Sequence, residues 1–342
     1  MRLQEMVLAQ LIACMQPLIE DELKSMVMQT FRDGPEELKN MLAYHMGWEG
    51  EGAGPAAQGK RVRPLLVLLS AGAAGGEWQR ALPAAAAVEL VHNFSLIHDD
   101  IQDQSDRRRG RLTLWKLWGI AQAINAGDAM FSLAHLSILR LEQTASPPIA
   151  LKSARLLQET CLELTKGQYL DMRYESENNL TLEDYWPMVR GKTAALISAC
   201  CELGALIAEA DETRRKAYHL FGNRLGLAFQ AQDDLLGIWG DAALTGKSAE
   251  SDLLTGKKSL PILFGLSQNG AFAQRWAQGP INAEEVRQLA RQLEIEGGLR
   301  YTQQITENLT QQALSSLREA NPVPEYGEAL EQLAVQLLNR HS

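Results

Sequence analysis

Helix-breaking residues are widely spaced in this chain, and that spacing limits what the chain can fold into. The sequence contains 12 prolines, yet residues 84–146 and 188–260 contain none, and these intervals are rich in Ala, Leu, Gln and Glu. Such residues favour helix, whereas proline ends or kinks one. Alternating runs of β-branched residues between turn pairs, which predict strands, are absent. The sequence therefore predicts an all-α fold.

Length and composition favour one large domain. The chain has 342 residues, of which 46% are hydrophobic, and no linker-like segment divides it, so we predict a single domain over residues 1–342. The four cysteines, of which Cys200 and Cys201 are adjacent, do not form a disulfide framework and indicate a reducing, cytoplasmic location. The most apolar internal run, residues 194–208, contains Glu202 and is too short to span a bilayer. We expect no transmembrane segment and no secretory signal.

An acidic cluster followed by a basic one stands at the end of an apolar helical run, ELVHNFSLIHDDIQDQSDRRRG, residues 89–110. Asp99 and Asp103 are one helical turn apart, with Asp100 beside them. Stacked carboxylates at a helix C-terminus are unfavourable unless water or a divalent cation with oxygen ligands surrounds them. The arginines at 107–109 suit phosphate oxygens. A solvated helix end is the plain interpretation, and a metal-bound polyphosphate is the functional one.

A second aspartate pair favours the functional interpretation. In FQAQDDLLGIWGD, Asp233 and Asp234 follow another apolar helical run, and Gln230 shares their face. Two such pairs facing one another across a cavity can hold several Mg²⁺ ions. The formal net charge of the chain is −9, so its overall field repels anions and we expect no nucleic-acid partner. Metal ions and local lysines and arginines must overcome that field at the site.

Three other chemistries are disfavoured by the sequence. The segment GDAALTGKS, residues 240–248, has five residues between its glycines where a nucleotide-binding loop has four, and no strand pattern precedes it. The six histidines are scattered without an HExxH or paired CxxC pattern, which disfavours zinc catalysis. No GxSxG elbow for a serine hydrolase is present.

Six short blocks in a fixed order resemble the trans-isoprenyl diphosphate synthases, also called the polyprenyl synthetase family. They are GKRVRP (59–64), HDDIQD followed by RRG (98–110), KGQ (166–168), GKT (191–193), FQAQDD (229–234) and GKKSLP (256–261). The resemblance is greatest to the geranylgeranyl diphosphate synthase branch. It implies a bundle of about a dozen helices around a central active-site cavity, the isoprenoid synthase class I fold, and a homodimer.

The resemblance divides the basic residues between two substrates. The positions matching Lys60, Arg63, His92 and Arg109 hold isopentenyl diphosphate without metal in related synthases. Lys60 and Arg63 lie three apart and can share a helix face, and His92 precedes Asp99 by two turns. Arg61 has no counterpart in this set, and we interpret it as a solvated charge.

The remaining matches surround the allylic substrate. The resemblance implies that Asp99, Asp103 and Asp233 bind three Mg²⁺ ions together with the allylic diphosphate, and that Asp100 and Asp234 support them. Four basic residues match direct diphosphate contacts: Arg108, Lys192, Lys247 and Lys257. Gln168 and Asp171 match supporting positions, or they form a core-facing polar pair. Thr193 and Gln230 match dipoles that face a carbocation, although Thr193 is equally suited to capping the backbone.

The implied reaction is the Mg²⁺-dependent, head-to-tail condensation of isopentenyl diphosphate with dimethylallyl, geranyl or farnesyl diphosphate. Phe94 and Ser95 match positions that limit product length, which favours a 20-carbon product; 15 carbons, or 25, are the alternatives. A class I terpene cyclase and a non-catalytic partner subunit are rival interpretations. Family members commonly have a third aspartate where this chain has Gly237. We expect that the helix does not persist past both Gly237 and Gly240, so that Asp241, one further turn along, does not replace the missing aspartate.

Overall fold

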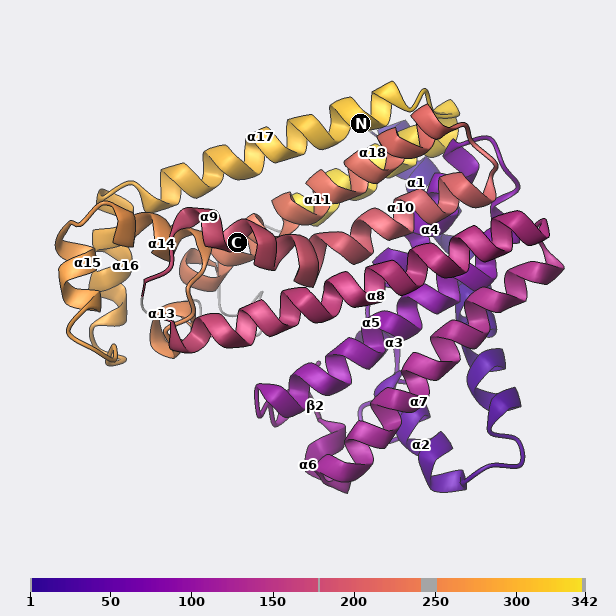
Figure 1. Ribbon diagram of the computed structural model, residues 1–342, viewed down its shortest axis with the longest axis horizontal. Coiled ribbons are helices and arrows are strands. Elements are labelled where there is room, and N and C mark those ends of the chain that lie inside the picture. Colours follow the sequence, from indigo (N-terminus) through magenta and orange to yellow (C-terminus); the bar gives the residue numbers. More distant parts are fainter. Residues whose placement is uncertain (1, 178, 241–250, 340–342) are drawn as a thin grey trace. The chain divides into compact units, whose positions relative to one another are not determined.

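The computed structural model describes residues 2–177, 179–240 and 251–339. Contacts between Cα atoms divide the chain into two compact units, each built from three segments (Figure 1). Unit 1 comprises Met1–Gln158, Cys200–Arg215 and Pro322–Leu330, and unit 2 comprises Glu159–Ala199, Lys216–Asn321 and Glu331–Ser342. The unit boundaries fall within or beside four helices: α8 (Pro147–Ser176), α10 (Ala195–Ile207), α11 (Glu212–Trp239) and α18 (Pro324–Leu338).

Unit 1 contains most of the N-terminal helices. Its α-helices are α1 (Arg2–Thr30), α2 (Glu36–His45), α3 (Pro55–Gln58), α4 (Val62–Ala73), α5 (Leu82–Gln102), α6 (Leu114–Trp118) and α7 (Ile120–Leu139). Two 3-10 turns, η1 (Trp78–Ala81) and η2 (Arg140–Gln143), connect them. Helices α5 and α7 lie side by side (Figure 1), and the hydroxyl of Ser137 on α7 donates to the carbonyl of Pro83 on α5 at 2.9 Å. The fully buried alanines 84–87 give α5 the slim face that this close packing requires.

Unit 2 contains the helices of the second half. They are α9 (Leu182–Val189), η3 (Arg190–Ala194), α13 (Ser251–Thr255), α14 (Leu260–Ser267), α15 (Ala271–Trp276), α16 (Val286–Ile295) and α17 (Gly298–Glu319). One buried cluster joins α9, α11 and α14 through Tyr185, Leu227 and Leu260. A second cluster packs Phe272 and Leu293 against Ile238 near the end of α11. These apolar contacts hold α11, which carries Asp233 and Asp234, between two small cores.

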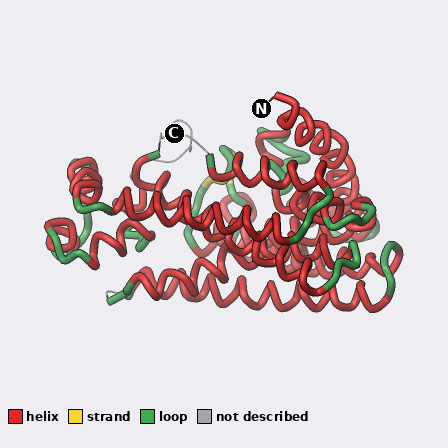
Figure 2. The backbone as a smooth tube through the Cα atoms, turned by 90° about the horizontal axis from the view of Figure 1, so that it is seen from above, coloured by secondary structure: helices red, strands yellow, loops and turns green. Residues whose placement is uncertain are grey.

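Helix accounts for nearly all regular structure in the described ranges, as Figure 2 shows, so the all-α prediction is confirmed. The exception in those ranges is a hairpin of two two-residue strands, β1 (Arg107–Arg108) and β2 (Arg111–Leu112). Its turn residues, Arg109 and Gly110, both have positive φ, at 50° and 78°. Two positive φ values in succession are characteristic of the turn type that matches strand twist in hairpins. No helix among the described residues is long and apolar enough to cross a membrane.

Candidate active site

The first aspartate cluster lies at the C-terminal end of α5 in unit 1, as predicted. Asp103 is the C-cap residue, and its N–H donates to the carbonyl of Asp99 at 2.8 Å. This helical geometry places both carboxylates on the same side of α5, one turn apart. Asp103 is exposed and Asp99 is partly exposed. Both side chains can therefore meet a ligand from solvent.

Asp100 has different surroundings from its neighbours. It is 2% exposed, its Oδ1 accepts a hydrogen bond from Nε of Arg108 at 2.8 Å, and Nη2 of Arg108 forms an ion pair with the same oxygen at 2.8 Å. Burial raises the pKa of Asp100, while Arg108 lowers it. The hairpin presents Arg108 to α5, so the carboxylate anchors the hairpin beside the aspartate cluster. In this structure the side chains of Asp100 and Arg108 are bound to one another; their predicted contacts with metal and diphosphate stay predictions.

Arg109 joins the first two motif blocks. Its Nη1 donates to the carbonyls of Ala57 and Gln58, at 2.8 and 2.9 Å. Gly59 makes room for this guanidinium, because a Cβ at Gly59 would lie 2.8 Å from Cζ of Arg109. Gly59 also has φ of +80°, a conformation that side chains rarely adopt. The glycine of GKRVRP is therefore required both by the backbone conformation and by the packing of Arg109.

Burial and neighbouring arginines together lower the pKa values of two histidines in unit 1. Burial and the charges of three arginines hold the pKa of His92 well below its ordinary value; these are Arg63, Arg109 and Arg108. Burial and four arginines lower the pKa of His45 to about 3; these are Arg109, Arg108, Arg61 and Arg111. The five residues Arg61, Arg63, Arg108, Arg109 and Arg111 are called the arginine cluster below. Both histidines are neutral at pH 7, and the cluster is a concentration of positive charge in a chain of negative net charge.

Arg61 is not a solvated charge, so that interpretation is wrong. It is 2% exposed, and its guanidinium donates to Glu20 at 2.5 Å and to Glu89 at 2.8 Å. Although desolvation works against it, the two carboxylates raise the pKa of Arg61. Trp48 Nε1 completes the network by donating to Glu20 at 2.9 Å. Arg61 thereby ties α4 to α1 and α5, and removal of its carboxylate partners would leave a buried charge without compensation.

The prediction that Lys60 shares a helix face with Arg63 is also wrong. Helix α4 begins at Val62, and Arg61 is its N-cap residue in the left-handed conformation, with φ of 48°. Lys60 is therefore in the preceding turn, where it is exposed, whereas Arg63 is in the first turn of the helix and partly buried. The charge of Arg63 lowers the pKa of His92, so these two predicted residues interact electrostatically.

Phe94 belongs to a row of rings between α5 and α7. Its centroid lies 4.9 Å from that of His98 and 4.9 Å from that of Phe131, and the Phe131 centroid lies 4.4 Å from that of His135. Ser95, the next residue, donates its hydroxyl to the carbonyl of His92 at 2.8 Å. Their predicted effect on product length stays a prediction.

In unit 2, two glycines bring the KGQ and GKT blocks into backbone contact. A Cβ at Gly191 would lie 2.7 Å from the Cα of Gly167, so neither position has room for a side chain. The GKT block lies in η3, a π-helical segment, a form that is frequent at functional sites. Lys192 from this segment forms a hydrogen-bonded ion pair with Asp171 of the adjacent α8. Gln168, on the same stretch of α8, is partly buried.

The second aspartate pair is embedded in a chain of hydrogen bonds. Thr193 donates to Gln230 Oε1 at 2.8 Å, and Gln230 Nε2 donates to Asp234 Oδ1 at 2.9 Å. The other oxygen of Asp234 accepts from the Tyr185 hydroxyl at 2.7 Å and from the Leu260 N–H at 2.9 Å. Asp234 is 2% exposed, and burial raises its pKa to about 6. Thr193 thus bonds to a side chain rather than capping the backbone.

Asp233 is exposed, in contrast to Asp234. Helix α11 continues through Gly237 but ends at Trp239, before Gly240, in agreement with the expectation that it does not persist past both glycines. Burial tends to lower the pKa of Lys257, but the negative charges of four carboxylates outweigh it and raise that pKa above its ordinary value. The carboxylates belong to Asp234, Asp252, Asp171 and Asp233. Lys247 and Asp241 lie outside the described residues.

The exposed carboxylates have the character of Mg²⁺ ligands. Mg²⁺ prefers oxygen donors and is usually bound through one or two carboxylates plus substrate phosphates, rather than in an all-protein cage. No group of three His, Cys, Asp or Glu side chains in the described ranges is placed to hold a metal ion by itself. The carboxylates of Asp99 and Asp103 in unit 1, and separately that of Asp233 in unit 2, reach solvent and are oxygen donors of the kind that Mg²⁺ prefers.

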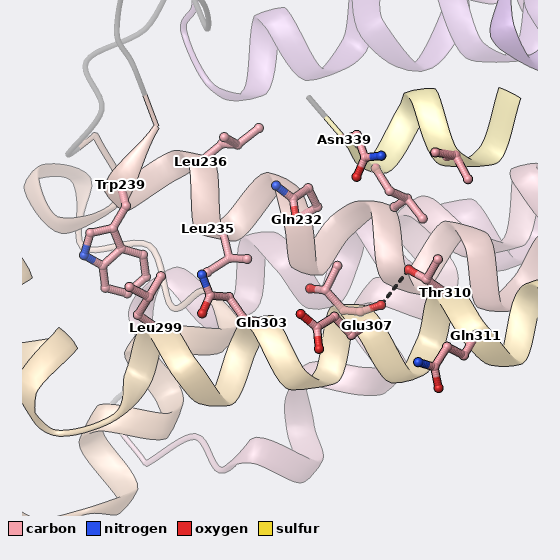
Figure 3. A pocket seen from close by; sticks show the side chains of 13 residues that line it. Gln232, Leu235, Leu236, Trp239, Leu299, Gln303, Glu307, Thr310, Gln311 and Asn339 are labelled. Atoms are coloured by element: carbon pink, nitrogen blue, oxygen red, sulfur yellow. Dashed lines mark hydrogen bonds between the residues drawn. The ribbon is translucent and has the colours of Figure 1, made fainter. Parts of the chain in front are cut away.

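A cavity of about 580 Å³ in unit 2 lies away from these residues (Figure 3). It is lined by Leu235 and Trp239 of α11, with Gln303 and Glu307 of α17 opposite them. Since an α-helix has about 3.6 residues per turn, Leu235 and Trp239 point away from the side of α11 that carries Asp233. This cavity therefore does not contain the predicted catalytic groups.

Some residues at these sites could not be found from motifs. His45, Tyr185 and Asp252 lie outside the matched blocks and join the sites through contacts with residues distant in the sequence. Tyr185 could have been suspected because it is a tyrosine within an apolar helical segment. A buried tyrosine hydroxyl usually has a hydrogen-bond partner, and this would have indicated a polar contact. Asp252 was visible only as a carboxylate close to the GKKSLP block.

Comparison with known proteins agrees with the motif order. The family model for polyprenyl synthetase matches residues 54–293. The chain is 40% identical over 297 residues to a geranylgeranyl diphosphate synthase of Mycobacterium tuberculosis, covering 85% of this chain and 84% of the relative. It is 41% identical over 274 residues to a (2E,6E)-farnesyl diphosphate synthase of Mycobacterium bovis, covering 77% and 75%.

A solved structure shows the same fold. The polyprenyl synthetase of Streptomyces coelicolor A3(2) aligns with a TM-score of 0.85 and 34% identity, over 98% of this chain and 99% of that one. The predicted family and fold class are therefore confirmed. The chain belongs to the polyprenyl synthetase family and is a prenyltransferase enzyme.

Proposed function

We propose that this enzyme condenses isopentenyl diphosphate with dimethylallyl, geranyl or farnesyl diphosphate in a Mg²⁺-dependent, head-to-tail reaction. The arginine cluster of unit 1 is the observation that carries this proposal. After burial, which is the largest cause, the charges of these arginines lower the pKa values of His45 and His92, although the chain as a whole is negatively charged. Such a field, next to solvent-facing Asp99 and Asp103, suits a diphosphate that is bound partly by arginine and partly through metal.

In this proposal, the two substrates are held by different groups. Lys60, Arg63, His92 and Arg109 bind isopentenyl diphosphate without metal. Neutral His92 can donate one N–H to a phosphate oxygen, and the arginines supply the charge. The allylic diphosphate is held by Arg108, Lys192 and Lys257, and Lys247 is proposed on family resemblance alone. Three Mg²⁺ ions, held by Asp99, Asp103 and Asp233, would act as Lewis acids on the leaving diphosphate.

The chemistry then needs no protein nucleophile. Breaking the allylic carbon–oxygen bond leaves diphosphate and a delocalised carbocation, and the double bond of isopentenyl diphosphate attacks that cation. The departing diphosphate can accept the proton that is lost. The hydrogen-bonded Thr193 and Gln230 supply oriented dipoles that stabilise positive charge without reacting with it. Asp171 positions Lys192 through their ion pair, so the ammonium is already placed before charge develops on the leaving group.

A short-chain product follows from the relatives. The relatives named above are a geranylgeranyl and a farnesyl diphosphate synthase, whose names correspond to products of 20 and 15 carbons, and this supports a short-chain product. We propose geranylgeranyl diphosphate, because Phe94 resembles the residue that stops elongation in short-chain synthases. The 15-carbon product is the second candidate.

We also propose a cytoplasmic homodimer in which residues 1–342 act as one domain. Exposed apolar side chains on α7, at Ile120, Ile124, Leu136 and Leu139, support self-association. Sedimentation of the pure protein would give the oligomeric state, and monomers at micromolar concentration would contradict it.

The activity is tested by incubating pure protein with isopentenyl diphosphate and each allylic starter, with Mg²⁺ or with a chelator. Mass spectrometry should show 20-carbon diphosphate only when Mg²⁺ is present. Hydrocarbon products would instead indicate a terpene cyclase. Lack of turnover with every starter would favour a non-catalytic partner subunit.

A further inference from the structure

Lys60 stands between two residues in the left-handed backbone conformation, and this separates it from helix α4. Gly59 has φ of 80° and Arg61 has φ of 48°. Glycine adopts such angles readily, whereas in other residues the Cβ atom then lies too close to the following carbonyl oxygen. Residues in this conformation persist only where the surrounding structure fixes them, and they are concentrated at functional sites. A specific cause is therefore expected at Arg61.

Two carboxylates hold the buried guanidinium of Arg61 in place. Its Nε and Nη2 donate to the two oxygens of Glu20, at 2.5 and 3.3 Å, and its Nη1 donates to Glu89 at 2.8 Å. Nη2 also donates to the carbonyl of Met46 at 3.4 Å. The planar guanidinium has a rigid fork of donors, so partners on α1 and α5 together determine where it lies. A side chain that is fixed at its far end restricts the backbone from which it projects.

The same contacts continue along α5 to the neighbour of His92. Asn93, which is fully buried, donates its side-chain N–H to Oε1 of Glu89 at 3.0 Å and to the Glu89 carbonyl at 2.8 Å. Burial lowers the pKa of Arg109 and the charge of Glu89 opposes this, so Glu89 attracts Arg109. The contacts of Glu89 thus connect the segment around position 61 with two further groups assigned above to isopentenyl diphosphate.

We propose that Arg61 is a positioning residue for isopentenyl diphosphate. Its clamped side chain holds the left-handed backbone that keeps Lys60 in the turn before α4, while Arg63 lies in the first turn of the helix. Two cationic side chains then project from a turn and from a helix, rather than from one helix face. This inference rests on the proposed function, because it takes Lys60 and Arg63 as diphosphate groups. A purely structural role, in which Arg61 only ties three helices together, is the competing explanation.

The two explanations differ in what they require of the backbone at position 61. Loss of Arg61 alone would leave Glu89 buried without its cation, so each change is combined with Glu89→Gln. In the Arg61→Gly, Glu89→Gln variant, glycine can still adopt the left-handed conformation. In the Arg61→Ala, Glu89→Gln variant, residue 61 favours the right-handed conformation, and Lys60 can then join α4. The two variants differ by one methyl group, so a purely structural role predicts the same binding for both.

The test measures binding of isopentenyl diphosphate by isothermal titration calorimetry without Mg²⁺. Glu89→Gln alone is the reference, because Arg61 keeps its contacts with Glu20 in that variant. The alanine double variant should bind roughly tenfold more weakly than the reference. The glycine double variant should stay within about threefold of it.

Two controls separate positioning from general damage to unit 1. Both double variants should bind an allylic thiolodiphosphate with Mg²⁺ as the reference does, since other groups are assigned to that substrate. Ser137→Ala removes a buried hydrogen bond between α7 and α5 in the same unit, and it should leave binding of isopentenyl diphosphate unchanged.

Each outcome decides a different question. Wild-type protein that does not bind isopentenyl diphosphate without Mg²⁺ would contradict the proposed function, and the role of Arg61 with it. Wild-type binding together with equal affinities of the alanine and glycine variants would overturn the role of Arg61 alone, as would equal losses for both substrates. If circular dichroism melting shows that the double variants do not fold, Glu20→Gln, which leaves the pair of Arg61 and Glu89 intact, should still weaken isopentenyl diphosphate binding about threefold. Unchanged binding in Glu20→Gln would then overturn the inference.

Discussion

In both aspartate pairs of this enzyme the first residue reaches solvent and the second is buried, but the buried residues have different partners. In each pair the first residue, Asp99 or Asp233, reaches solvent, and the second, Asp100 or Asp234, is 2% exposed. Asp100 is satisfied by the cation of Arg108, whereas Asp234 is satisfied by neutral donors. A double aspartate here is thus one candidate ligand and one anchor, not two equivalent ligands.

The difference in partners reflects the surroundings of each pair. Unit 1 has the arginine cluster, so a buried carboxylate there is neutralised by a nearby charge. In unit 2, burial raises the pKa of the Asp234 carboxyl group to about 6, although Lys257 lowers it and a hydroxyl, an amide and a backbone N–H donate hydrogen bonds to the carboxylate. The first region is organised mainly by charge and the second mainly by hydrogen bonds. Substitutions should separate the two.

The largest effect should come from the exposed member of each pair. Asp99→Ala or Asp233→Ala should reduce kcat roughly a thousandfold, since loss of one preorganised charge-stabilising group costs up to that much. Asp100→Asn and Asp234→Asn keep the buried shape and should cost only about tenfold. Steady-state kinetics with saturating Mg²⁺ would measure all four variants.

The same variants test whether the two pairs act together. If both bind metal on one diphosphate, the losses in Asp99→Ala and Asp233→Ala should be far from additive in the double variant. Strict additivity would indicate independent sites. Near-normal turnover in an Asp99→Ala, Asp103→Ala variant would remove the metal assignment for unit 1.

The two buried aspartates, Asp100 and Asp234, should contribute differently to the free energy of unfolding. Arg108→Ala leaves Asp100 as a buried charge without its cation, which should lower the free energy of unfolding by about 3 kcal/mol. Tyr185→Phe removes one of the donors to Asp234 and should cost about 1–2 kcal/mol. Lys116→Ala, which breaks an exposed pair with Asp106, is the control and should change little. Urea denaturation would give the order, and equal losses for both anchors would contradict the comparison.

The features that could be predicted from the sequence are those that depend on residues close together in the chain. The aspartate spacing, the end of α5 and the motif order follow from residues within one or two turns of each other. Arg61 could not be placed in this way, because its partners Glu20 and Glu89 are 41 and 28 residues away. The hairpin at β1 and β2 was missed because its turn is Arg-Gly, whereas Asn-Gly or Asp-Gly is the usual signal.

The sites illustrate the same limit. Gly237 was noticed as a missing aspartate, but its reason is the carboxylate of Asp252, which lies beyond a stretch outside the described residues. Gly59, Gly167 and Gly191 were recognised only as members of sequence motifs. In the structure, each lets a side chain or backbone segment of another block pack closely against it. Spacing identifies such residues, and only packing explains them.

Lowering the pH should reduce the free energy of unfolding, because His45 in unit 1 is harder to protonate when folded than when unfolded. An unfolded histidine takes up a proton near pH 6.5, but folded His45 does so only near pH 3, because it is buried among Arg109, Arg108, Arg61 and Arg111. Stability from this group is therefore complete above pH 6.5 and is lost as the pH falls below it, by about 2 kcal/mol at pH 5. His45→Gln should flatten the dependence of unfolding free energy on pH between 7 and 5 by that amount. An unchanged slope would show that His45 titrates normally.

Substrate affinity should divide along the same line. Lys60→Ala or Arg63→Ala should raise KM for isopentenyl diphosphate about tenfold, with little change in KM for the allylic substrate, because these residues bind the metal-free diphosphate. Lys257→Ala should show the reverse preference. Initial rates with each substrate varied in turn would measure both constants. Equal damage to both KM values by Lys60→Ala would contradict the assignment of separate groups to the two diphosphates.

The smallest effect on rate, though a visible one on product, is expected at Phe94. Its ring lies between His98 and Phe131, and Phe94→Ala would remove an aromatic group that buries on the order of 150–250 Å². If this ring limits elongation, the vacated apolar space can take a longer tail at roughly 25 cal/mol per Å² of buried apolar surface. Product chains should then lengthen, and Ser95→Phe should shorten them. Phe264→Ala, which removes a ring stacked on Tyr301 in unit 2, is the matched control and should leave product length unchanged. An unaltered product distribution in Phe94→Ala would place the limit deeper, near Val91 or Val88.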